Sequence, residues 1–352
     1  MRELERLLVS HLEANGPIGF DDYQAQALYA PGLGFYATGH GAGRRRDFLT
    51  SPEVGPLFGA VIGRALDTWW AEMGEPATFT VVEAGAGPGT LARSILAAAP
   101  RCAGALDLVL VEVSDAQRGS HPAGVRSRPD LPAPDELGGG PTVVLANELL
   151  DNLPVALAER GADGWSEVRV GAAGGRLVEV LGPLVPEQID WCDALVPDAA
   201  IGARIPVQAD AAGWVLDALA LAGTGGRVVA IDYARSTTAV FAQRPQREWL
   251  RTYADHGRAT DPYADPGSAD ITCDIAVDQL GLVASPATVR TQAAFLRQHG
   301  IDELVAEGRA RWDELGLSGG LAAIEARSRV SEAAALLDPD GLGGFTVVEW
   351  LP

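Results

Sequence analysis

The sequence predicts an α/β fold built on a mostly parallel sheet, with helices on both faces of the sheet. Apolar runs of strand length alternate with helical patterns along the middle of the chain, as is typical of doubly wound folds. One run leads directly into a glycine-rich turn, and polar clusters follow three others. Because ligands bind beyond the carboxyl ends of parallel strands, these positions predict a binding site at one edge of the sheet.

The N-terminal segment, residues 1–76, is expected to form a helical cap and lid in front of the sheet. Met1–Asn15 has an amphipathic helical pattern and lacks the apolar core of a signal peptide. A longer amphipathic helix is predicted from about Glu53 to Met73, because Ser51 is a favourable N-cap residue and Pro52 suits the first helical position.

Residues 77–352 are expected to form the core of the fold. Two segments interrupt its alternation of strands and helices, at about 155–205 and 233–270. The first contains a β-hairpin pattern from Ala156 to Leu181, and the second is polar, rich in turn formers and a candidate substrate loop. The predicted core strands are Thr78–Glu83, Leu108–Glu112, Thr142–Ala146, Arg227–Ile231 and Phe345–Trp350.

The turn after the first core strand reads Glu-Ala-Gly-Ala-Gly-Pro-Gly-Thr. Gly85, Gly87 and Gly89 let the backbone approach a ligand, and the following helix directs its first N–H groups at the ligand's polar end. A dinucleotide site has the wider spacing Gly-x-Gly-x-x-Gly. The closer spacing here, with Glu83 two positions before the first glycine, resembles motif I of class I S-adenosylmethionine methyltransferases. A tight connection without a ligand is the alternative, since glycine is abundant in this chain.

Carboxylates follow the next two strands at the same expected edge. Glu112 ends the second strand, where a carboxylate can bind both hydroxyls of a ribose. After the third strand, Asn147, Glu148 and Asp151 form a compact cluster that can accept hydrogen bonds from a cation or an amine. Helix capping by Asn147 and surface exposure of Asp151 are the structural alternatives.

Composition limits the classes of function. The net charge of -20 opposes binding to nucleic-acid phosphates, whereas it suits either a cationic acceptor or simple solubility. The chain has no lysine, which excludes a P-loop lysine and Schiff-base chemistry. The three cysteines lie far apart without histidines at ligand spacing, so neither a disulfide framework nor a metal site is expected. With no apolar stretch of membrane-spanning length, we expect a cytoplasmic protein that does not bind membranes.

Motifs spread along nearly the whole chain resemble the MidA-like methyltransferases, a family that includes a mitochondrial complex I assembly factor acting on an arginine. The resemblance implies a Rossmann-like class I methyltransferase fold, S-adenosylmethionine as cofactor and a protein arginine as acceptor. The sequence departs from the family pattern at Arg46, where glycine is usual, and in the segment Cys-Asp-Ile-Ala-Val-Asp that follows Thr272. The matching segments are Leu28-Tyr29 to Tyr36, Asp47-Phe48, Thr50-Ser51-Pro52-Glu53, Glu83–Gly89, Val111-Glu112 with Ser114 and Gln117, Asn147–Asp151 with Leu153-Pro154, Asp270-Ile271-Thr272, and Thr291-Gln292 with Phe295-Leu296.

If the acceptor is a guanidinium, carboxylates must orient it and polarise its nitrogen. We therefore expect Glu148 and Asp151, with Asn147, to be the catalytic group. The remaining site predictions are Ser51 and Pro52 for the cofactor, beside the glycine turn and Glu112, and Asp47, Glu53, Asp232 and Tyr233 for the substrate.

Three alternatives stay open at the level of the sequence. A nicotinamide-dependent oxidoreductase would share the fold, but it requires wider glycine spacing and a hydride-transfer acid. An assembly scaffold that binds the cofactor without turnover would keep the same binding loop. A small-molecule methyltransferase would differ only in its acceptor. The oligomeric state is not defined by the sequence, and a homodimer is compatible with it.

Overall fold

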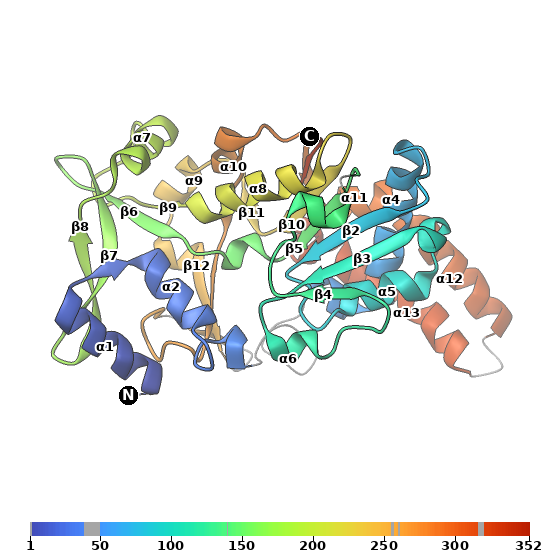
Figure 1. The fold of residues 1–352 in the computed structure, drawn as a ribbon, viewed down its shortest axis with the longest axis horizontal. Helices are drawn as coiled ribbons and strands as arrows, with labels where there is room; N and C mark the ends of the chain where they lie inside the picture. The colour runs from blue at the N-terminus through green and yellow to red at the C-terminus, as the bar shows by residue number, and fades with distance from the viewer. Residues whose placement is uncertain (1, 39–49, 139, 255–256, 260, 316–319) are drawn as a thin grey trace.

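The computed structural model describes residues 2–38, 50–138, 140–254, 257–259, 261–315 and 320–352. Its strands form two larger sheets that lie beside each other along the longest axis of the molecule, as Figure 1 shows. The N-terminal helix lies at the end with the second sheet, and a pair of C-terminal helices lies at the opposite end.

The central sheet confirms the predicted α/β fold. Among the described residues its strand order is β16-β17-β10-β5-β2-β3-β4. β10, β5, β2, β3 and β4 pair in parallel, whereas β17 runs antiparallel to both of its neighbours. The strands are β2 (Phe79–Ala84), β3 (Leu106–Val111), β4 (Arg126–Arg128), β5 (Val143–Asn147), β10 (Arg227–Asp232), β16 (Thr288–Thr291) and β17 (Thr346–Trp350).

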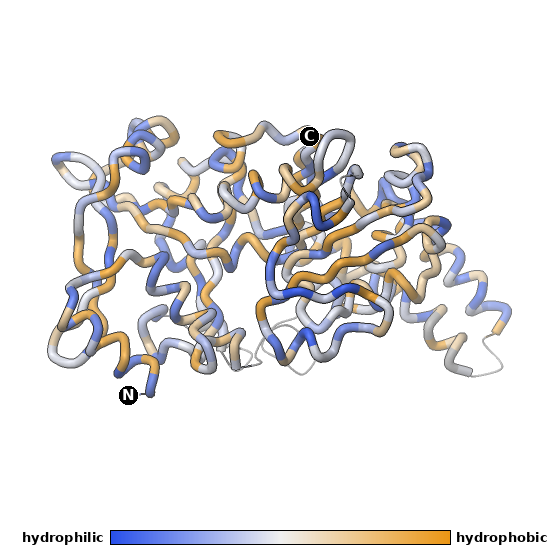
Figure 2. Tube along the Cα trace, viewed as in Figure 1, coloured by the Kyte–Doolittle hydropathy of each residue, from blue (hydrophilic) through white to orange (hydrophobic). Residues whose placement is uncertain are grey.

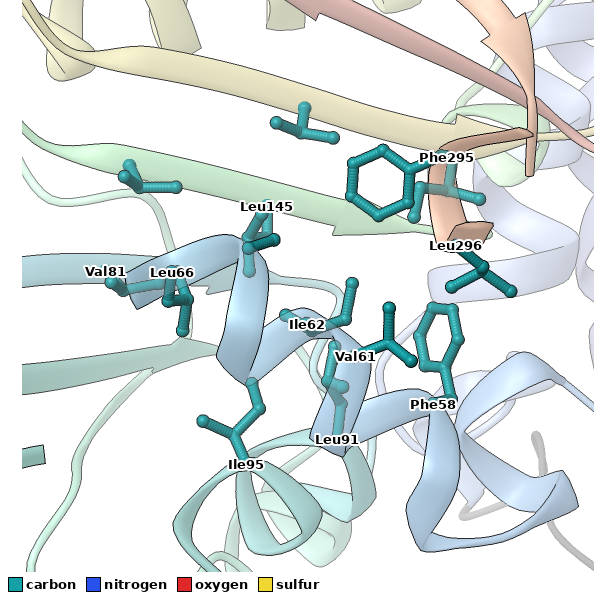
Figure 3. Packing of buried hydrophobic residues seen from close by; sticks show 14 of the residues in the cluster. Phe58, Val61, Ile62, Leu66, Val81, Leu91, Ile95, Leu145, Phe295 and Leu296 are labelled. Atoms are coloured by element: carbon teal, nitrogen blue, oxygen red, sulfur yellow. The ribbon is translucent and has the colours of Figure 1, made fainter. Parts of the chain in front are cut away.

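Helices cover both faces of this sheet because successive residues of each strand point to opposite faces. Val81 belongs to the apolar cluster under α4 (Pro56–Glu72) and α5 (Thr90–Ala98), whereas Val82 belongs to the cluster under α8 (Ala209–Ala222). Figure 2 shows these buried strands as largely hydrophobic. In Figure 3, side chains of α4, α5 and α11 (Gln292–Gln298) pack together beside the strands of the sheet.

The second sheet contains the predicted β-hairpin. β7 (Trp165–Ala173) and β8 (Arg176–Gly182) pair antiparallel around the two-residue turn Gly174-Gly175, in which both residues have positive φ. The other members are β1 (Ile18–Gly19), β6 (Ala156–Arg160) and β9 (Arg204–Val207). α1 (Glu3–Asn15) and α2 (Phe20–Tyr29) share an apolar cluster with this sheet, whereas α4 packs on the central one.

A smaller sheet of three strands forms around the candidate substrate loop. β12 (Leu250–Ala254) pairs with β13 (Gly257–Ala259) and with β14 (Asp270–Cys273) inside and after the candidate substrate loop. The remaining elements are η1 (Tyr36–Thr38), α3 (Ser51–Val54), η2 (Arg101–Gly104), α6 (Asp115–Arg118), η3 (Pro134–Leu137), η4 (Leu150–Asn152), α7 (Pro186–Leu195), β11 (Ala234–Arg235), α9 (Ala239–Ala242), η5 (Gln246–Glu248), β15 (Ile275–Ala276), α10 (Val277–Val283), α12 (Ile301–Leu315), α13 (Leu321–Leu336) and η6 (Leu342–Gly344).

The helix expected from about Glu53 to Met73 is interrupted in the structure. α3 ends at Val54, Gly55 is extended, and α4 begins at Pro56. A residue before proline avoids the helical conformation, which explains the break. The N-cap of α3 is Thr50, so Ser51 is the first helical residue and the expected N-cap assignment was wrong by one position.

Candidate active site

The loops that follow the parallel strands meet at one edge of the central sheet. A cavity of about 430 Å³ opens there, lined by the loops after β2, β3 and β5, by α3 and by the end of α2. Sheets of this type bind ligands beyond the carboxyl ends of their strands, so this cavity is the candidate active site.

The glycine turn forms one wall of the cavity. Gly85 and Gly87 line it with φ angles of 69° and 55°, which L side chains rarely adopt. A Cβ on Gly85 would lie 3.1 Å from Leu149 Cδ1, and a Cβ on Gly87 would lie 3.2 Å from Gln117 Oε1. Gly89 lies outside the cavity lining and directly precedes α5. The turn therefore presents backbone to the cavity where a side chain has little room.

The carboxylate of Glu112 lines the same cavity at the end of β3. Its Oε2 accepts a hydrogen bond from the N–H of Gly87 at 3.0 Å, and its Oε1 accepts one from the N–H of Ser114 at 2.8 Å. Burial raises its pKa. Each carboxylate oxygen has a second lone pair, so the group can still accept hydrogen bonds from a diol.

Glu83 is a buried carboxyl at the end of β2 that also lines the cavity. Its Oε2 is inaccessible to solvent and has no hydrogen-bond partner among the described residues. Burial raises the pKa of this carboxyl to about 8. An unpartnered buried oxygen of this kind indicates that a donor from a ligand is missing.

Glu148 extends the end of β5 into the cavity with an unusual backbone. Its φ of 53° is rare for a residue with a side chain, and its N–H donates to Ile231 O at 2.8 Å. Its Oε1 accepts from the N–H of Ser51 and from Asn147 Nδ2, both at 3.1 Å. Its Oε2 has no partner among the described residues. Burial, with the nearby charge of Asp232, raises the pKa of Glu148 to about 8.

Asp151 and Asp232 lie beside the cavity without lining it. Asp232 Oδ2 accepts from the N–H groups of Leu150 and Asp151 at 2.8 and 3.2 Å, and its Oδ1 accepts from that of Tyr233 at 2.8 Å. Asp232 thus holds the chain after β5 in place. The carboxyl of Asp151 is buried, Oδ1 has no partner in the described chain, and burial near other carboxylates raises its pKa well above the ordinary value.

The residues predicted around α3 divide into two groups. Pro52 and Glu53 line the cavity, and Glu53 Oε1 accepts from Thr90 Oγ1 at 2.7 Å. Ser51 is fully buried, and its Oγ donates to Gln292 Oε1 at 3.0 Å. Asp47 lies outside the described residues.

Tyr233 does not line the cavity. Its ring packs against that of Phe345 with centroids 4.0 Å apart, and the guanidinium of Arg251 lies 4.9 Å from its centroid. The structure therefore brings Asn147 and Glu148 to the cavity with most of the predicted cofactor group. Asp232 and Tyr233, predicted to bind the substrate, do not line it.

Two tyrosines at the cavity were not predicted as site residues. Tyr29 ends α2 and Tyr36 begins η1, and their rings stack with centroids 5.7 Å apart. Both belong to the segment that carries the family resemblance, but nothing in their spacing indicated that the segment would reach the central sheet. Asn152 also lines the cavity and was missed.

The fold and the cavity together define the class of protein. A mostly parallel sheet with a glycine turn after one strand and a carboxylate after the next is the arrangement of a nucleoside-binding α/β enzyme. The model of the family described as "Putative S-adenosyl-L-methionine-dependent methyltransferase" matches residues 61–294. The chain belongs to this family, and it is an S-adenosylmethionine-dependent methyltransferase.

Curated relatives and a solved structure agree with this assignment. The mouse protein named "Protein arginine methyltransferase NDUFAF7, mitochondrial" is 28% identical, over 84% of this chain and 74% of the relative. The homologue of that name from Drosophila melanogaster is 27% identical, over 77% of this chain and 68% of the relative. A Burkholderia thailandensis protein solved with S-adenosyl-homocysteine has a TM-score of 0.81 and 26% identity, over 99% of this chain and 92% of that one.

The groups at the cavity suit S-adenosylmethionine. Gly85 and Gly87 leave a cradle that a Cβ would fill, and the orphan oxygen of Glu83 lacks a donor such as an ammonium group. No group of three or more His, Cys, Asp or Glu side chains in the described ranges is arranged to hold a metal ion. None of the helices described here is both long and apolar enough to cross a membrane.

Proposed function

We propose that this methyltransferase transfers its methyl group to an arginine side chain of a protein, and that Glu148 orients the guanidinium. The observation that carries the proposal is the unequal hydrogen bonding of the two oxygens of the Glu148 carboxyl. Two donors fix Oε1, while Oε2 has no partner among the described residues, and the side chain lines the cavity. A carboxylate is the group that best matches the planar fork of a guanidinium. The names of the relatives support the same acceptor.

The chemistry requires alignment and the removal of one proton. The cofactor supplies an electrophilic methyl group, and transfer forms a bond from the guanidinium nitrogen to this carbon as the carbon–sulfur bond breaks. In this proposal Glu148 holds the nitrogen in line and accepts the proton that the nitrogen loses. A pKa of about 8 suits a base near neutral pH. Asp151 does not line the cavity, and the charge of Glu148 contributes to its raised pKa, so in this proposal it is coupled to Glu148 without contacting the acceptor.

The cofactor contacts are part of the same proposal. Gly85 and Gly87 leave room for the amino-acid end, Glu83 binds its ammonium group, and Glu112 binds the ribose hydroxyls. Pro52 and Glu53 close the cavity from α3. Ser51 and Gly89 support these contacts from behind, Ser51 through its N–H to Glu148.

The proposal is tested with S-adenosylmethionine labelled in the methyl group. Wild-type protein and Glu148→Gln are incubated with protein extract from cells of the source organism that lack this gene. Hydrolysed protein is then analysed for methylated arginine, and the small-molecule fraction is counted separately. Methylarginine formed by the wild type and absent with the variant supports the proposal.

Other distributions of the label overturn the proposal in distinct ways. Label in the small-molecule fraction alone identifies a small-molecule methyltransferase. Cofactor binding without any transfer identifies an assembly scaffold. Methylated lysine or another protein residue retains a protein acceptor but rejects arginine.

Two further predictions concern the location of the protein in the cell and its oligomeric state. The relatives are named as mitochondrial proteins, while the sequence of this chain favours the cytoplasm. A homodimer is compatible with the chain and is tested by sedimentation of the purified protein.

A further inference from the structure

Two stacked tyrosine rings form part of the wall of the cavity that Glu148 also lines. The rings of Tyr29 and Tyr36 have centroids 5.7 Å apart and planes inclined by 17°. Both side chains line the same cavity as Glu148 and Asn152. They come from the N-terminal segment, which also packs with the second sheet, so this segment contributes directly to the site.

The hydroxyl groups of both tyrosines are already bound by the protein. Tyr29 donates to Asn152 O at 3.0 Å, and Tyr36 donates to Asp270 Oδ1 at 3.1 Å. Asn152 Nδ2 donates to the same oxygen of Asp270 at 2.9 Å. Burial, with the charges of Asp270 and Asp151, raises the pKa of both hydroxyls, so the rings stay neutral. The aromatic carbons are therefore the part of each side chain that remains for a ligand.

The charges around the rings favour a cation. Of the described residues that line the cavity, none is basic. The face of a tyrosine ring carries negative partial charge, and a cation within about 6 Å of the centroid is attracted to it. The acidic lining residues are Glu53, Glu83, Glu112, Asp130 and Glu148.

We propose that Tyr29 and Tyr36 form a cation-binding wall that receives the charged side chain of the acceptor beside Glu148. This inference rests on the proposed function for the identity of the acceptor, and it adds how a charged acceptor is selected over a neutral one. The cofactor also carries a cation, its sulfonium, so the test must separate the two sources.

The test measures peptide binding to protein saturated with S-adenosyl-homocysteine. Three peptides share one sequence and differ only in a central arginine, lysine or citrulline, and affinities are measured by fluorescence anisotropy. The variants are Tyr29→Phe, Tyr36→Phe, Tyr29→Leu and Tyr36→Leu. Tyr263→Leu, which removes a tyrosine outside this cavity, is the matched control. Thermal unfolding of each variant verifies folding.

We expect the arginine peptide to bind at least tenfold more tightly than the citrulline peptide. Each leucine variant should weaken arginine binding about fivefold to thirtyfold, because the ring face is lost. Each phenylalanine variant should stay within about threefold of wild type, because the face is kept. The control should not change.

Several results overturn the inference. Leucine variants that bind the arginine peptide like wild type reject it while leaving arginine methylation intact. Phenylalanine variants as weak as leucine variants assign the effect to the hydroxyls. Lower affinity for S-adenosylmethionine with unchanged affinity for S-adenosyl-homocysteine assigns the rings to the sulfonium. Absence of binding by every cationic peptide rejects it as well. Tyrosine-dependent binding of the lysine peptide alone retains the wall and rejects the arginine acceptor.

Discussion

The backbone N–H of Ser51 donates a hydrogen bond to Glu148 Oε1 at 3.1 Å, although 97 positions separate the two residues in the chain. The first turn of α3 is thereby fixed to the strained end of β5, where Glu148 has a φ of 53°. Because this hydrogen bond and the one from Asn147 Nδ2 both hold Oε1, they also fix the orientation of the carboxyl group and the position of Oε2.

Glu148→Gln should lower kcat by at least a hundredfold while changing the dissociation constant for S-adenosyl-homocysteine by less than about threefold. Glutamine keeps an acceptor for the Ser51 N–H but loses the charge and the basic oxygen. Steady-state kinetics and calorimetric titration measure the two quantities. Glu187→Gln, on the exposed start of α7, is the control and should leave both unchanged. Equal losses in both quantities would make Glu148 a cofactor ligand instead.

Gly85→Ala should weaken cofactor binding more than tenfold, whereas Gly174→Ala should not affect it. Both glycines have positive φ, 69° and 59°, so each substitution strains the backbone by about 1 kcal/mol. Only Gly85 lines the cavity, and a Cβ on Gly174 would have no atom within 4 Å. Titration with S-adenosylmethionine separates the two effects. Unchanged binding by Gly85→Ala would remove the turn from the cofactor site.

The protein without ligand should lose stability as pH rises from about 5 to 8, and Glu83→Gln should make this dependence shallower. The pKa of Glu83 is about 8 in the folded protein and 4.5 for an ordinary glutamate, as in the unfolded chain. Between pH 4.5 and 8 the folded state therefore holds a proton that the unfolded chain has lost. The free energy of unfolding contributed by this group therefore falls with pH, by up to about 1.4 kcal/mol per pH unit. Urea unfolding at pH 5.5, 6.5 and 7.5 measures the slope. Equal slopes in variant and wild type would contradict the prediction.

The rate of methyl transfer should rise with pH toward a plateau above about pH 8, because Glu148 must lose its proton to act as a base. Asp232→Asn should move this rise to lower pH, since the charge of Asp232 contributes to the raised pKa of Glu148. Profiles of kcat/KM from pH 6 to 9.5 give both midpoints. Loss of activity in Asp232→Asn without any shift would indicate that only the hydrogen bonds of Asp232 to the chain after β5 matter.

The strands and the glycine turn could be predicted from the sequence because they depend on local patterns. The apolar run before Gly85 and the polar residues after it are contiguous, and parallel pairing then brings Glu112 and Glu148 to the same edge. The difference between Glu148, at the cavity, and Asp151, beside it, could not be predicted. It depends on the positive φ of Glu148 and on capping by Asp232, both of which arise from tertiary contacts.

The packing positions of the N-terminal helices could not be predicted from the sequence pattern either. α1 and α4 are both amphipathic, but the period of a helix does not say which sheet its apolar face will cover. α1 packs with the second sheet and α4 with the central one. Tyr29 and Tyr36 could not be assigned to the site for the same reason. The proposed boundary at residue 76 stays a prediction.

The hydrogen bond from Ser51 to Gln292 has a consequence for the synthesis of the protein. It joins residues 241 positions apart, and Gln292 is fully buried beneath the helix that carries Pro52 and Glu53. During translation α3 reaches its place only after nearly the entire chain has left the ribosome. A chain that ends before Gln292 thus has the glycine turn of the cavity, but α3 on the opposite wall lacks the hydrogen bond to Gln292. We therefore expect methyl transfer only from a polypeptide that extends past Gln292 and retains Ser51, which a fragment of residues 61–294 would lack.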